Sequence, residues 1–200
     1  RVEGEVFGTY IVAEMGESVF LIDKHAAHER VIFEELKQKR DVSKEILSKP
    51  LLLPLTVMLT EDELSAATEN KDELLAVGFR FNLGEKNADI LEIPDEISVK
   101  DAEGLFVTML DEIASGKGNP KITEEIRRDK MLYQVACKAA IKGGRVYGMD
   151  HIEWICKRLL KKPGEDGAVI KTCPHGRPVA FKLTKKELEK YFGRTGSVGL

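Results

Sequence analysis

The chain has 200 residues, enough for one large domain or two small ones, and 42% of them are apolar, which is enough for a core. Charged residues make up 32%, yet the net charge is only −3, which excludes a strong basic field that would attract nucleic acid by itself. No apolar run is long enough for a membrane span, and three widely spaced cysteines do not suggest a disulfide framework. We therefore expect a cytoplasmic protein in a reducing compartment, without a membrane partner. Because the chain starts at Arg1 and not at Met, we expect it to be part of a longer protein.

The beginning of the chain has the pattern of a β-hairpin followed by a helix. Residues 6–13 are rich in β-formers, and a second strand is predicted over 19–22 after a turn that contains Gly16. A run of good helix formers then predicts a helix over 26–39.

Acidic and histidine side chains gather where this strand meets this helix. Asp23 lies at the joint, where its carboxylate can cap the first helical turn. His25 and Glu29 are four residues apart and therefore share one helix face. Such a cluster suits a divalent cation, although a cap and a solvated face would explain the same residues. His28 and His151 are expected at the surface.

A separate α+β unit is predicted in the middle of the chain. Two prolines bracket an apolar run over 49–57, which indicates an edge strand and a boundary between subdomains. Thr60 and Glu63 form a capping box for a helix that should reach Val77 and end at Gly78. The remaining elements predicted for this unit are strands 79–83 and 90–93 and a helix over 101–114.

The last third of the chain alternates helices with short strands. The predicted elements are helices 123–143, 150–161 and 184–192 and strands 168–172 and 179–183. We expect an N-terminal box from Asp150 and Glu153 in the second of these helices, and a capping box from Thr184 and Glu187 in the third.

Possible metal ligands come from three separate stretches of the sequence. They are Asp23, His25 and Glu29, then Cys137, then Cys173 and His175. Thiolate, imidazole and carboxylate together suit Zn²⁺, and Mn²⁺ suits a more oxygen-rich position. The Cys173–His175 segment is the most telling, because flanking prolines and Gly176 can hold both side chains at one point. Cys137 among alanines also fits a core residue, and Cys156 in an amphipathic helix is read as core.

A family resemblance covers nearly the whole chain. Residues 23–29 (DKHAAHE), followed by Glu34, resemble the endonuclease motif of MutL mismatch-repair proteins. Residues 136–142 resemble their A-C-[RK] segment, 173–178 match their C-P-H-G-R-P segment, and 192–194 resemble their F-x-R segment. The resemblance is to the C-terminal region of MutL, without the N-terminal ATPase region.

The resemblance implies a mixed α+β fold with a dimerisation subdomain built from both chain ends. Residues 1–49 and 123–200 would form this endonuclease subdomain, and residues 50–122 would form an inserted external, regulatory subdomain. The implied activity is metal-dependent nicking of duplex DNA during mismatch repair, with Asp23 and Glu29 as the catalytic acids.

The resemblance also implies cofactors and partners. The metal ligands for Zn²⁺ and/or Mn²⁺ would be Asp23, His25, Glu29, Cys137, Cys173 and His175. The partners would be a second copy of the chain, duplex DNA, the N-terminal ATPase region, MutS and a sliding clamp. Two positions depart from the family: Lys24 replaces a glutamine of the endonuclease motif, and Lys49 replaces the glutamine of a clamp-binding segment that continues through Leu51 to Pro54.

Two other functions compete with the nuclease. A zinc-stabilised dimerisation module without catalysis would fit the low net charge, since phosphate contacts by basic residues dominate affinity for DNA. A Cys/His hydrolase is the weaker alternative, because no glycine elbow accompanies Cys173 and the carboxylates would have no role.

Overall fold

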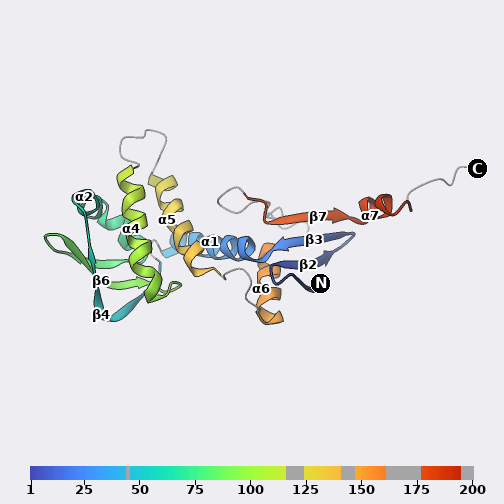
Figure 1. Ribbon diagram of the computed structural model, residues 1–200, viewed down its shortest axis with the longest axis horizontal. Coiled ribbons are helices and arrows are strands. Elements are labelled where there is room, and N and C mark those ends of the chain that lie inside the picture. Colours follow the sequence, from blue (N-terminus) through green and yellow to red (C-terminus); the bar gives the residue numbers. More distant parts are fainter. Residues whose placement is uncertain (44–45, 116–123, 141–146, 161–176, 195–200) are drawn as a thin grey trace, which may run out of the picture. The chain divides into compact units, whose positions relative to one another are not determined.

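The computed structural model describes residues 1–43, 46–115, 124–140, 147–160 and 177–194 (Figure 1). Within these residues the chain forms seven helices and seven strands, and the strands make two antiparallel sheets. The predicted α+β class is confirmed. None of the helices in the described part carries an apolar stretch that could cross a bilayer.

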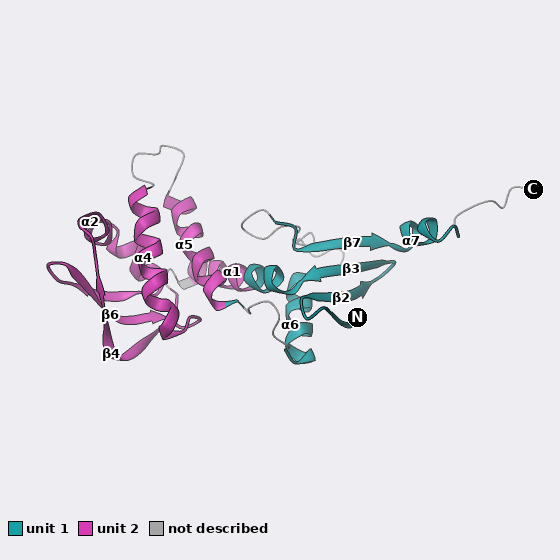
Figure 2. Cartoon of the chain, viewed as in Figure 1, with its two compact units in different colours: residues 1–31, 140–200 teal, residues 32–139 magenta. Residues whose placement is uncertain are grey.

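The chain divides into two compact units (Figure 2). Unit 1 comprises residues 1–31 and 140–200, and unit 2 comprises residues 32–139. Helix α1 (Lys24–Ser43) contributes residues to both units. The predicted limits between the dimerisation subdomain and the external subdomain, at 49/50 and 122/123, stay a prediction.

Unit 1 contains a four-stranded sheet with the order β1-β2-β3-β7. Its strands are β1 (Val2–Val6), β2 (Tyr10–Met15), β3 (Ser18–Asp23) and β7 (Ala180–Thr184). The β2–β3 pair is the hairpin that the sequence predicts. The predicted strand over 6–13 is correct from Tyr10 onward but wrong before it, because Phe7 and Gly8 have positive φ values of 55° and 61° and turn the chain between β1 and β2.

The core of unit 1 lies on one face of this sheet. Alternate residues of β2 and β3 are buried there, because successive strand side chains point to opposite faces. The core residues are Ile11, Ala13, Phe20 and Ile22 of the sheet, Ala26, Ala27 and Val31 of α1, Ile152, Ile155, Cys156 and Leu159 of α6 (Met149–Leu159), and Val179. The expected core position of Cys156 is confirmed, and burial raises the pKa of its thiol to about 11.

Helix α6 begins differently from the prediction. Its N-cap is Gly148, which has no side chain to accept a hydrogen bond, so the expected box from Asp150 and Glu153 is wrong. Asp150 instead lies in the first turn, where a negative charge is favourable, and Glu153 forms an ion pair with Lys157 at 3.1 Å.

Unit 2 contains a three-stranded sheet with the order β4-β6-β5. Its elements are β4 (Ser48–Met58), α2 (Glu61–Glu69), α3 (Lys71–Ala76), β5 (Arg80–Leu83), β6 (Asn87–Pro94), α4 (Val99–Ser115) and α5 (Glu124–Ala139). Strand β4, which contains Pro50 and Pro54, lies at the edge, as predicted. The capping box of Thr60 and Glu63 is confirmed, but the predicted single helix is broken at Asn70, whose backbone and side-chain N–H groups both donate to the Ala66 carbonyl.

The described C-terminal residues return to unit 1. Strand β7 leads into α7 (Lys185–Tyr191), and the capping box of Thr184 and Glu187 is present as predicted. The predicted strand over 168–172 and the loop with Cys173 and His175 lie outside the described residues.

Candidate active site

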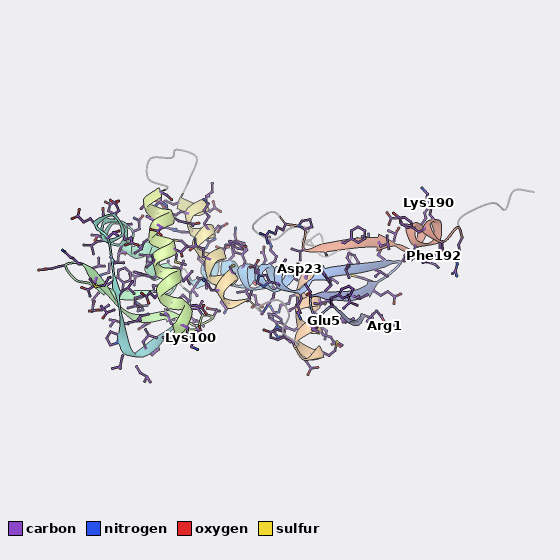
Figure 3. The ribbon with its side chains drawn as sticks, viewed as in Figure 1. Arg1, Glu5, Asp23, Lys100, Lys190 and Phe192 are labelled. Carbon is purple, nitrogen blue, oxygen red and sulfur yellow. The ribbon has the colours of Figure 1, made fainter. Side chains whose placement is uncertain are left out.

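Asp23 is held at the end of β3, where α1 begins (Figure 3). Its backbone N–H donates to the Val179 carbonyl at 2.9 Å, and Tyr10 of β2 is its partner in the sheet register. Its Oδ1 accepts a hydrogen bond from the Ala26 N–H at 3.0 Å, which confirms the predicted cap. The carboxylate therefore has a defined place between a strand and a helix.

His25 and Glu29 meet on the first turns of α1. The Nε2 of His25 lies 3.1 Å from Oε1 of Glu29, so the predicted shared face is confirmed. The His25 side chain is 40% exposed, whereas that of Glu29 is only 6% exposed. The pair thus combines a nearly buried carboxylate with an imidazole that solvent can reach, and both are donors that divalent metals accept.

Three further predicted ligands come from other parts of the chain. Cys137 is half-buried on α5 in unit 2, and Cys173 and His175 lie outside the described residues. The described part of the chain contains no group of three His, Cys, Asp or Glu side chains arranged to hold a metal ion. The described donors alone therefore do not make a complete metal site, and the six-residue ligand set stays a prediction.

His28 is a residue that the sequence analysis placed wrongly. It was expected at the surface but is 7% exposed, because it lies on the same side of α1 as Val31 and packs against α6. Its ring contacts His151 and Trp154 edge-on, with centroid distances of 4.9 and 5.7 Å. His151 is half-buried and stacks on the rings of Tyr147 and Trp154. The only sequence signal for this cluster was the spacing of His28 between Ala27 and Val31.

The burial of His28 should make unfolding depend on pH. Burial, and secondarily the nearby charges of His151 and His25, lowers the pKa of His28 from 6.5 to about 4. The folded state therefore favours the neutral ring, so the stabilisation is complete above pH 6.5 and is lost as the pH falls toward 4. The loss should be at most about 3 kcal/mol. Urea unfolding in EDTA measures it, and a His28→Leu variant should have a flatter profile in this range; an equally steep profile would contradict the assignment.

Lys24 is a second residue whose environment the sequence did not indicate. Its side chain has no exposed surface, although lysine is almost never fully buried without a partner. Lys24 directly follows Asp23 in the sequence and forms an ion pair with Glu5 of β1. Figure 3 labels Glu5 and Asp23 in unit 1. In the sequence, Lys24 is distinguished only as a departure from the family glutamine.

The sheet face opposite the core of unit 1 carries apolar side chains. Val12, Leu21 and Phe181 are direct neighbours across β2, β3 and β7, so they form one row on this face. Phe181 is 62% exposed and Leu21 is also exposed. We call this row, together with the exposed pair of Val6 and Tyr10, the outer apolar face. Apolar surface of this kind commonly marks a protein–protein contact.

These features define a class of protein: an α+β domain that combines an exposed apolar sheet face with an acidic site at a strand–helix joint. The chain belongs to the family described as the MutL C terminal dimerisation domain, which matches residues 4–147. The resemblance noted in the sequence is thereby confirmed.

Curated relatives agree with this membership. Proteins named DNA mismatch repair protein MutL are 31% identical in Dictyoglomus turgidum and 35% identical in Clostridium botulinum strain Loch Maree, each over 97% of this chain. The protein of the same name from Thermosipho africanus is 33% identical over 93% of this chain. The matches cover 32%, 28% and 30% of these relatives, so the chain spans about a third of their length.

Proposed function

We propose that this chain is the dimerisation and nicking region of a DNA mismatch repair protein. In this proposal it forms a homodimer and acts as a metal-dependent endonuclease that nicks duplex DNA. Family membership supports the repair role and the dimer. The observation that supports the nicking activity is the fixed Asp23 carboxylate, which lies two residues before the His25–Glu29 pair.

The chemistry follows from the residue types. A divalent cation polarises a phosphoryl oxygen and lowers the pKa of a bound water. In this chain Asp23 would orient the attacking water, since its position is fixed by the cap and by strand pairing. Glu29 would serve as a metal ligand, and its burial would hold the side chain in place. His25 would present a donor atom that solvent can reach. Cys137, Cys173 and His175 are the further proposed ligands for Zn²⁺, with Mn²⁺ at the more oxygen-rich position.

The proposal is tested by nicking of a supercoiled plasmid. The purified chain should open the plasmid in Mn²⁺, should lose this activity in EDTA, and should regain it when Mn²⁺ is added back. Elemental analysis of the same sample identifies the metal that it carries. A metal-loaded dimer that leaves the plasmid intact would instead support the alternative function, a zinc-stabilised dimerisation domain without catalysis.

Strand β4 carries the segment proposed to bind a sliding clamp. Leu52 and Leu53 are both exposed, and they lie where the β4–β6 register is irregular between Pro50 and Leu55. If this segment inserts into a clamp, a Leu52→Ala/Leu53→Ala variant should bind at least about tenfold more weakly, because two buried apolar anchors are removed. Surface plasmon resonance measures the affinity. Met58→Ala, on the exposed end of the same strand, is the matched control. Equal affinity of the double variant and the wild type would count against this partner.

The other partners remain part of the same proposal. Binding to MutS and to the N-terminal ATPase region is expected from the resemblance, and a cytoplasmic location is expected from the composition. Co-sedimentation with purified MutS tests the MutS interaction directly.

A further inference from the structure

The side chain of Lys24 is enclosed by elements other than its own helix. Its ammonium forms an ion pair with Glu5 of β1 and donates a hydrogen bond to the Gly8 carbonyl at 2.7 Å. The ring of Tyr147 lies on another side, with its centroid 5.5 Å from Nζ. Among the described residues, Lys24 is the one charged side chain without any exposed surface. Its position is therefore determined by the β1 strand, the β1–β2 turn and the segment before α6.

A buried ion pair of this kind contributes little to net stability. Removing an ammonium and a carboxylate from water costs nearly as much as their attraction returns, and apolar residues of similar volume often stabilise a fold as well or better. Loss of one partner is different, because it leaves an uncompensated buried charge. The Lys24–Glu5 pair can instead favour one specific arrangement of the segments that it joins.

The arrangement joined by Lys24 includes the backbone that directly follows Asp23. The Lys24 N–H donates to the Thr9 carbonyl at 3.0 Å, so backbone and side chain both attach the β1–β2 turn to the start of α1. Asp23 itself is held by its N–H bond to Val179 and by its side-chain bond from Ala26. A shift of the Lys24 backbone would therefore change the direction of the Asp23 carboxylate.

We propose that Lys24 is a positioning residue, and that the buried Lys24–Glu5 pair fixes the direction of the Asp23 carboxylate. The catalytic part of this inference rests on the proposed nicking function, whereas the positioning of Asp23 can be measured without it. The pair acts through Asp23 and does not itself touch DNA or metal.

The experiment compares a single and a double variant of the full chain. Lys24→Met leaves the Glu5 carboxylate, whose side chain is only 14% exposed, without its cation and should lower the urea midpoint. Lys24→Met/Glu5→Leu replaces the pair by apolar side chains and should recover that midpoint. If Lys24 positions Asp23, the double variant should still exchange the Ala26 amide hydrogen about tenfold faster than the wild type, because the cap from Asp23 is looser. Its kcat for nicking should fall about 10- to 100-fold, since a misplaced catalytic group loses much of its effect.

A matched control uses the exposed ion pair of α6. Lys157→Met/Glu153→Leu removes two charges of the same kinds from the surface of the same unit. Its Ala26 exchange and its kcat should equal those of the wild type. This control separates the effect of the buried pair from a general effect of charge removal.

The two readouts distinguish failure of this inference from failure of the proposed function. Wild-type Ala26 exchange in the stable double variant overturns the positioning role, whether or not the chain nicks DNA. A wild-type kcat in that variant also overturns it. If the wild-type chain does not nick at all, the nicking proposal fails, and faster Ala26 exchange in the double variant still supports the positioning of Asp23 by Lys24.

Discussion

Replacing Asp23 by Asn should reduce nicking by on the order of 100- to 10,000-fold, the usual contribution of a positioned acid or base. The change is nearly isosteric. The amide oxygen of Asn can still accept the hydrogen bond from the Ala26 N–H, which Asp23 now accepts at 3.0 Å, and Asn is as good an N-cap residue as Asp. The folded structure should therefore persist while the negative charge is lost. Initial rates of plasmid opening in Mn²⁺ measure the effect, and urea unfolding checks that stability is unchanged.

A matched control for this substitution is Asp150→Asn. Asp150 is likewise an acid at the start of a helix, but it lies in the first turn of α6 and has no proposed role in the site. Its variant should nick like the wild type. If Asp23→Asn also nicks at the wild-type rate, Asp23 has no part in the reaction, and the proposed site loses its principal acid.

Replacing Phe181 by Asp should convert the expected dimer into a monomer at micromolar concentration. Phe181 is exposed on β7, in register with Leu21, and a second copy of the chain would bury it in a two-fold interface. A carboxylate buried there without a partner should cost about 3 kcal/mol, and a two-fold dimer buries two of them, so dimerisation should weaken by roughly 10,000-fold. Sedimentation equilibrium over a range of concentrations gives the dissociation constant directly.

The control for the dimer surface is Phe181→Leu, which keeps an apolar side chain at the same position. It should remain a dimer, with an affinity reduced much less than in Phe181→Asp. A Phe181→Asp chain that sediments as a dimer would move the interface away from the outer apolar face, without changing the family assignment.

Helix starts with a complete sequence signature were predictable, because their hydrogen bonds join residues within three positions of each other. The boxes at Thr60 and Thr184 and the cap from Asp23 formed as expected. The His25–Glu29 contact was predictable for the same reason, since the helical repeat alone brings the two side chains together. By contrast, the N-cap of α6 is Gly148, whose lack of a side chain gives no signal for a cap.

Turns that need unusual backbone conformations were less predictable. The turn between β1 and β2 requires a positive φ at Phe7, which an aromatic residue rarely adopts, so the sequence favoured a continuous strand there. Similarly, Asn70 divides α2 from α3 without a glycine or proline to mark the break. At Phe7 the observed conformation departs from the preference of the residue, whereas at Asn70 it agrees with the preference of asparagine for helix ends.

The sequence by itself determined the family, the local helix caps and the composition of the candidate site, because each of these depends on residue types at short, fixed spacings. Tertiary structure decided which charged and polar groups are buried. Lys24 meets Glu5, 19 residues away, and His28 meets the ring of His151 on α6, more than a hundred residues away. Neither partner can be read from the neighbouring sequence, because burial depends on which distant elements cover a given helix face. The ionisation of His28 and the proposed fixing of Asp23 therefore follow from the packing of β1 and α6 on α1, and not from the motif that contains these residues.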